Sequence, residues 1–235
     1  MYFYGFDVYY LLLVLPAMLF ALWANAHVNS TFKRYSQMRN ARGMTGADAA
    51  RAVLAANGVT GVRIERVSGN LTDHYDPRTN VVRLSSSVYD NCSTAAIGVA
   101  AHEVGHAIQY SVGYAPIKLR AAIIPVTSIG SKLAVPLIVI GLLLSGLSSA
   151  FIGVSYAGLL FFALATFFQL VTLPVEFNAS RRAMQSLESL SILTNDELVG
   201  ARKVLSAAAM TYVAALAVSL MQLLRFAMLI NRRRD

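Results

Sequence analysis

The chain reads GVAAHEVGHAIQY from residue 98 to residue 110, with two histidines and a glutamate inside an otherwise apolar run. Ionisable side chains are costly to bury among apolar residues unless a partner compensates them. Two residues four positions apart return to nearly the same face of an α-helix, so His102 and His106 would lie side by side. This stretch therefore predicts a buried helix that carries a polar site.

The spacing His102-Glu103-Val104-Gly105-His106 is the HExxH pattern. Neutral imidazoles are favoured zinc ligands, and both histidines can reach one ion from the same helical face. Glu103 is turned one step further round the helix, where it can act as the catalytic base toward a water at the open metal position. The alternative is a pair of core histidines on one helix. We predict one Zn²⁺ per chain.

A catalytic zinc ion usually has three protein ligands and an open position for water. The stronger candidate for the third ligand is Glu176, which follows Pro174 in LPVEFNASRRA, because proline suits the first turn of a helix. His74, in the turn-rich TDHYDPRT, is the other candidate. Ser180 lies four residues after Glu176 and could bond to a ligating histidine. It could equally be a small residue in a helix contact.

Around this helix the sequence predicts a small α+β region. TGADAARAVLAANGV reads as a helix that Thr45 caps and Gly58 ends. VRIERVS alternates like a half-exposed strand, and NVVRLS (80–85) is a second strand candidate after the predicted turn. The apolar helix that carries HExxH begins at a cap among Asp90, Ser93 and Thr94 and stops near Gly113.

The rest of the chain is typical of a membrane protein. Of its 235 residues 56% are hydrophobic and only 14% are charged, against about 25% charged in soluble domains. Val8–Ala26 is long enough to span a bilayer, and Ala121–Pro174 is long enough for two spans joined at Gly146–Ser149. Val204–Leu224 forms the last predicted span. A retained anchor, not a cleaved signal peptide, explains the first span, because no basic segment precedes it.

The predicted fold is a mainly α membrane protein with about four transmembrane helices and a small α+β region. We expect these segments: an anchor (1–26), a cytosolic α+β region with the HExxH helix (27–120), a transmembrane hairpin (121–175), a cytosolic helical segment (176–203), and a last transmembrane helix with a basic tail (204–235).

Basic residues predict the orientation of the chain. The net charge is +8, and the arginines lie in loops and near spans without the interleaved aromatics of nucleic-acid sites, so no nucleic-acid partner is expected. Lysines and arginines favour the cytosolic side, which places 27–120 and 176–203 in the cytosol. With four spans this orientation places both termini outside, whereas the basic tail NRRRD favours the cytosol for the C-terminus. A last helix that does not fully span is the alternative.

Three segments carry a resemblance to a known family: LTDHYDPRTNVVRLS, GVAAHEVGHAIQ and TLPVEFNASRRA. They resemble the YugP-type neutral zinc metallopeptidases, which are bacterial integral membrane proteins. The chain is more distantly similar to the HtpX-type gluzincins. The resemblance implies a gluzincin-like zinc peptidase region, with His102, His106 and Glu176 as zinc ligands and Glu103 as general base. It also implies that the strand around Val81–Ser85 pairs with an extended substrate.

One position departs from the HtpX-type pattern. That pattern has an aspartate four residues after the ligand glutamate, where this chain has Ser180. The support of a zinc-ligating histidine by an aspartate therefore cannot be transferred from the HtpX-type pattern to this chain.

The expected function is zinc-dependent endopeptidase activity in a bacterial inner or plasma membrane. Its substrates would be polypeptides, with membrane and misfolded proteins as candidates, and its active site would face the cytosol. A donor to the developing oxyanion is also required. The candidates are Arg181, Arg182, Tyr75 and Asn178.

Two other functions compete with a peptidase. A non-catalytic scaffold with a structural zinc would need a fourth ligating side chain, and Cys92 lies ten residues before His102. A metal transporter would need ionisable residues within its spans, where only Lys132 occurs. The sequence makes no prediction of the oligomeric state.

Overall fold

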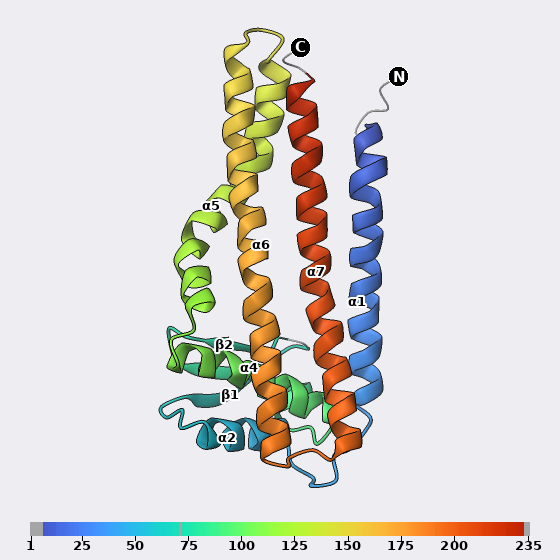
Figure 1. Cartoon of the computed structure of the whole chain (residues 1–235), viewed down its shortest axis with the longest axis vertical. Coiled ribbons are helices and arrows are strands. Elements are labelled where there is room, and N and C mark those ends of the chain that lie inside the picture. Colours follow the sequence, from blue (N-terminus) through green and yellow to red (C-terminus); the bar gives the residue numbers. More distant parts are fainter. Residues whose placement is uncertain (1–6, 71, 233–235) are drawn as a thin grey trace. The chain divides into compact units, whose positions relative to one another are not determined.

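The computed structural model describes residues 7–70 and 72–232, so the first six residues of the predicted anchor and the last three of the NRRRD tail lie outside the described residues. The described residues divide into two compact units, and Figure 1 labels their helices and strands. The first unit contains residues 7–24, 119–173 and 211–232, and the second contains 25–118 and 174–210. Each unit is described separately below.

Four helical segments in the described ranges are long and apolar enough to cross a membrane. They are Tyr10–Tyr35, which is a π-helical turn (Tyr10–Val14) followed by α1 (Leu15–Tyr35), then α5 (Ala115–Leu144), α6 (Ala150–Ser189) and α7 (Asn195–Asn231). The mainly helical fold with about four spans is thereby confirmed. The helices continue through the predicted segment boundaries, and the division between bilayer and cytosol stays a prediction.

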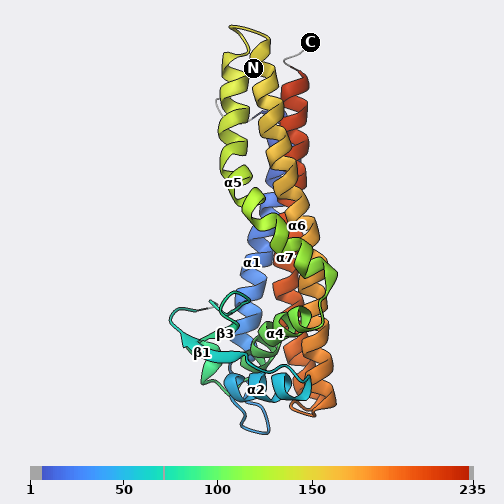
Figure 2. The same ribbon diagram turned by 90° about the vertical axis from the view of Figure 1, so that its left-hand side faces the viewer.

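The first unit is held together by small residues and by buried apolar side chains. The predicted turn near Gly146 is present, because α5 ends at Leu144 and α6 begins at Ala150. The two helices approach closely at Gly158, where an added Cβ would lie 2.7 Å from the Ala134 carbonyl oxygen. Figure 2 shows α5 and α6 side by side along this part. An ion pair of 2.7 Å between Arg225 and Asp7 joins α7 to the first described residue.

The helix start predicted at Pro174 is wrong. Pro174 lies inside α6, which continues without a break from Ala150 to Ser189. Proline removes one backbone hydrogen bond from a helix, but apolar helices that pack on neighbours tolerate the loss. Glu176 is therefore carried by a continuous helix and not by the first turn of a new one.

The second unit contains, within its described residues, a sheet of three strands in the order β1–β3–β2. β1 (Arg63–Val67) and β3 (Val81–Ser85) are parallel, and β2 (His74–Asp76) is antiparallel to β3. The prediction that His74 lies in a turn is wrong, since Tyr75 pairs with Val82 in a hairpin.

The sheet also corrects the predicted substrate strand. β3 is the central strand, so its Val81–Ser85 backbone pairs with β1 on one side and, over Val81–Arg83, with β2 on the other. A substrate that extends this sheet must pair with an outer strand. Of the two outer strands, β2 packs against the helix that carries HExxH.

That helix, α4 (Thr94–Ser111), lies at the centre of the second unit. It packs on the short α3 (Ser86–Tyr89), and also on α2 (Gly46–Ala56) and the sheet, which Figure 2 shows beside it. Thr45 is confirmed as the cap of α2, and of the three cap candidates for α4 the structure selects Ser93. Thr45 caps α2 through a reciprocal capping box with Asp48, and Ser93 caps α4 by accepting a bond from the Ala96 amide. The capped, buried α4 is a rigid support for its histidines.

Candidate metal centre

The two histidines of α4 lie together, as their spacing predicts. Their ring centroids are 4.8 Å apart and the rings are nearly perpendicular. The His106 residue is buried, and the His102 side chain retains only 15% of its exposure. The Nε2 atoms of both rings face one carboxylate oxygen of α6.

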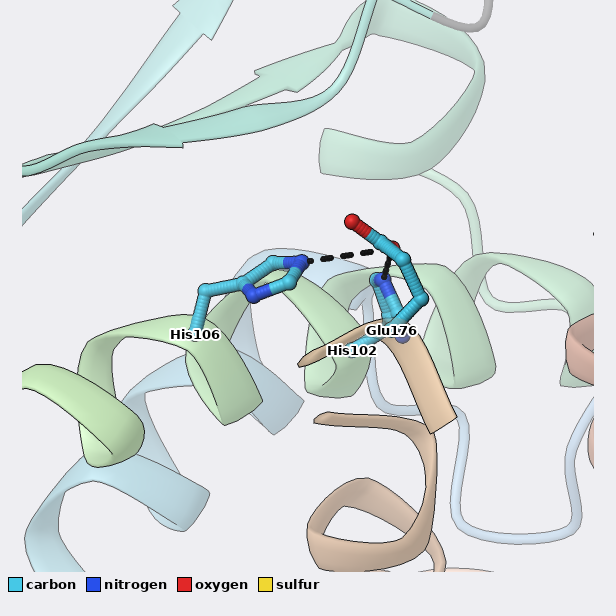
Figure 3. A group of neighbouring side chains, drawn as sticks. All are labelled: His102, His106 and Glu176. Carbon is cyan, nitrogen blue, oxygen red and sulfur yellow. Dashed lines mark ion pairs between the residues drawn. The ribbon is translucent and has the colours of Figure 1, made fainter. Parts of the chain in front are cut away.

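Glu176 of α6 completes this group. Its Oε2 atom lies 3.3 Å from His102 Nε2 and 3.6 Å from His106 Nε2 (Figure 3). A tetrahedral ion with ligand bonds of about 2.0–2.1 Å places its donor atoms about 3.3–3.4 Å apart. The two distances from Glu176 Oε2 to the imidazole nitrogens are close to this spacing, and all three donor atoms lie within 4.8 Å of one another. Two imidazoles with a carboxylate are a donor set that zinc favours.

The electrostatics of the centre suit a cation. Burial alone would lower the pKa of His106, but the carboxylates of Glu176 and Glu103 together raise it above its usual value. Carboxylates that stabilise a positive charge on this imidazole would also stabilise a bound metal ion.

Each imidazole has a second hydrogen bond at its Nδ1 atom. His102 Nδ1 lies 3.0 Å from Ser180 Oγ, and His106 Nδ1 lies 3.0 Å from Gln109 Oε1. Bonds of this kind fix the ring orientation of ligating histidines. The sequence predicted Ser180 as a partner of a ligating histidine. It did not predict Gln109, because a glutamine three residues after the second histidine of HExxH could equally be exposed.

Close approach of α4 and α6 depends on Gly105. A Cβ atom built at this position would lie 2.5 Å from the Ala179 carbonyl oxygen, a backbone atom that no side-chain rotation can move. The glycine inside HEVGH therefore allows the helix that carries Glu176 to reach the histidines.

Comparison with known proteins decides the family. The family model described as "Putative neutral zinc metallopeptidase" matches residues 10–231. The chain belongs to this family of neutral zinc metallopeptidases. It is 48% identical over 226 residues, 96% of this chain and 98% of the relative, to a Bacillus subtilis (strain 168) protein named "Putative membrane protease YugP". No solved structure matches the chain.

As a zinc metallopeptidase the chain also needs a catalytic base. Glu103 is 8% exposed and adjoins His102 in α4, and its charge acts on His106. A carboxylate in this position is close to the metal ligands without being one of the three converging donors.

Two further predicted residues, His74 and Tyr75, lie in β2. Exposed His74 binds the Thr72 carbonyl through Nδ1 and is not part of the donor group found among the described residues. The Tyr75 hydroxyl donates to Asn80, and its ring packs against Tyr110 at the end of α4.

On α6, the candidate oxyanion donor Arg181 is exposed, and its exposure gives no support for a role in the buried site. Asn178 instead contacts Gln109, whose Nε2 donates to Asn178 Oδ1.

Proposed function

We propose that this metallopeptidase is a membrane-integral endopeptidase with one zinc ion held by His102, His106 and Glu176. The observation that carries the proposal is the convergence of these three donor atoms within 4.8 Å of one another. Three is the number of protein ligands in catalytic zinc sites, whereas a structural site has four. This favours a peptidase over a scaffold with a structural zinc.

When bound, zinc would polarise the scissile carbonyl and lower the pKa of the attacking water. Glu103 takes a proton from that water while the water oxygen bonds to the carbonyl carbon. The same carboxyl group then gives the proton to the amine nitrogen as the carbon–nitrogen bond breaks. Ser180 and Gln109 hold the rings of His102 and His106 throughout.

The polypeptide substrate would reach the centre from the cytosol. Fifteen lysines and arginines lie in residues 27–120 and 176–203, and such residues collect on the cytosolic side of bacterial membranes. Unstructured segments of membrane or misfolded proteins are the substrates that we propose, because an extended chain can pair with the outer strand of a sheet by main-chain bonds.

Zinc dependence tests the function directly. We expect the purified full-length protein to cleave casein or an unstructured peptide, to lose this activity on dialysis against a chelator, and to regain it with equimolar Zn²⁺. The measurement is product formation by mass spectrometry together with metal content. Full activity after the metal has been removed would contradict the proposal.

Removal of Glu176 is expected to weaken the centre. Glu176→Ala leaves two histidines, so we expect zinc affinity to fall by at least about 100-fold, because one of three protein ligands is lost. Glu188→Ala is the matched control, since Glu188 is an exposed glutamate on the same helix. Zinc titration against a competing chelator measures both variants. Unchanged affinity in Glu176→Ala would assign the third ligand elsewhere.

A further inference from the structure

Gln109 is a fully buried side chain one turn beyond His106 on α4. Its Oε1 atom lies 3.0 Å from His106 Nδ1. Its Nε2 atom donates to the Val175 carbonyl at 2.8 Å and to Asn178 Oδ1 at 3.0 Å, and both of these acceptors belong to α6. One amide therefore connects a histidine of α4 to the helix that carries Glu176.

The neighbours of this amide decide which of its ends carries the hydrogens. The Val175 carbonyl can only accept a hydrogen bond, so the end of Gln109 that faces it must be the NH₂ group. Arg182 gives the same answer independently. Its Nε–H can only donate, and it lies 2.9 Å from the Asn178 side chain, so Asn178 presents its oxygen toward both Arg182 and Gln109.

The orientation of Gln109 then fixes the proton on His106. Because the amide NH₂ group faces α6, the carbonyl Oε1 faces His106 Nδ1, and a carbonyl oxygen can only accept. Nε2 also faces an acceptor, Glu176 Oε2, but at 3.6 Å, whereas Nδ1 lies 3.0 Å from Gln109 Oε1. The shorter contact favours a neutral His106 with its hydrogen on Nδ1 and its lone pair on Nε2.

His102 lacks an equivalent constraint. Its Nδ1 partner is the Ser180 hydroxyl, which can donate or accept, so this contact permits either tautomer. The two ligand histidines are thus supported in different ways.

We propose that Gln109 is a positioning residue, which sets the tautomer of His106 before the metal binds and ties that ring to α6. Asn178 and Arg182 hold the amide in its orientation. The inference rests on the proposed zinc centre. A lone pair that already points into the centre spares metal binding the cost of a proton shift and a ring rotation.

Two substitutions at Gln109 separate its acceptor from its donor. Gln109→Met keeps the length of the side chain but removes both functions. Gln109→Glu keeps an acceptor for His106 and loses the donor to α6. Thr94→Val is the matched control, because it removes a buried side-chain bond from the same helix, from Thr94 Oγ to the Tyr35 carbonyl at 3.2 Å, away from the metal centre.

The first readout is the tautomer of His106 in zinc-free protein. The full-length chain is labelled with ¹⁵N-histidine and studied by NMR in alkaline buffer, where the imidazoles are neutral. With four histidines in the chain, a His106→Gln spectrum assigns the signal. We expect the Nδ1–H form in wild type, Gln109→Glu and Thr94→Val, and a mixture of both tautomers in Gln109→Met.

The second readout is zinc affinity, measured by chelator competition. We expect a loss of about 10–100-fold for Gln109→Met, as for other groups that orient metal ligands. Thr94→Val should change the affinity by less than about threefold, because its bond acts on stability alone. If Gln109→Met does not fold, Asn178→Ala removes one acceptor of the amide and should lower zinc affinity by about tenfold, and an unchanged affinity in this variant would then overturn the inference.

These outcomes decide the inference separately from the proposed function. An unchanged Nδ1–H tautomer with unchanged zinc affinity in Gln109→Met would overturn it, and so would the other tautomer in the wild type. Absence of peptide hydrolysis would contradict the endopeptidase alone, because both readouts use zinc-free or zinc-titrated protein without substrate.

Discussion

Replacement of Glu103 by glutamine is expected to reduce peptide hydrolysis by about 10²–10⁴-fold, the usual contribution of a general acid–base group. Glutamine has nearly the same shape but cannot accept the proton of the attacking water. The three converging donors, His102, His106 and Glu176, do not include Glu103, so zinc affinity should stay within about twofold of wild type.

The measurement pairs turnover of an unstructured peptide with zinc content of the same sample. Glu188→Gln makes the same chemical change at an exposed glutamate and should retain full turnover. Turnover in Glu103→Gln equal to that of wild type would refute the role of this residue as the base. Loss of both zinc and turnover would instead show Glu103 to be part of the metal site.

Gly105→Ala is expected to separate the two helices that form the centre. The new methyl group would meet the Ala179 carbonyl oxygen at 2.5 Å, and relief requires that α4 and α6 move apart. We expect the free energy of unfolding to fall by about 1–3 kcal/mol, as in other overpacked sites. Zinc affinity should fall by about 10-fold or more, because Glu176 moves away from the histidines.

Gly98→Ala is the control for this substitution. Gly98 lies on the same helix and is buried, but its added Cβ would meet the Ala201 Cβ at 3.3 Å, a much milder contact. Both variants gain about 1 kcal/mol of helix propensity from alanine, so this contribution cancels between them. Thermal unfolding and zinc titration of the full-length protein measure the difference. Equal behaviour of the two variants would show that the close approach at Gly105 is not required.

Much of the fold follows from local patterns in the sequence. The periodicity and length of the apolar runs predict the long helices, Thr45 predicts where α2 begins, and the cap candidates Asp90, Ser93 and Thr94 bracket the start of α4. These features are local, because a cap bonds to its own first turn and a span needs only enough apolar residues.

The predictions failed where distant segments decide the conformation. Proline opens some helices and lies inside others, and only the packing around Pro174 selects the second case. His74 becomes part of a strand because Tyr75 pairs with Val82, and that pairing also makes β3 the central strand. Gln109 gains a role only because Val175 and Asn178 lie opposite it.

The sequence by itself determined the family, the helical membrane character and the two histidines on one helical face, because HExxH and an apolar run both act within a single helix. Only the tertiary structure brought Glu176 to within 3.3 Å of His102 and placed Ser180 and Gln109 behind the rings. The reason is physical. A ligand about seventy residues away is positioned by how closely two helices pack, and that distance is set at Gly105 by the backbone of the other helix.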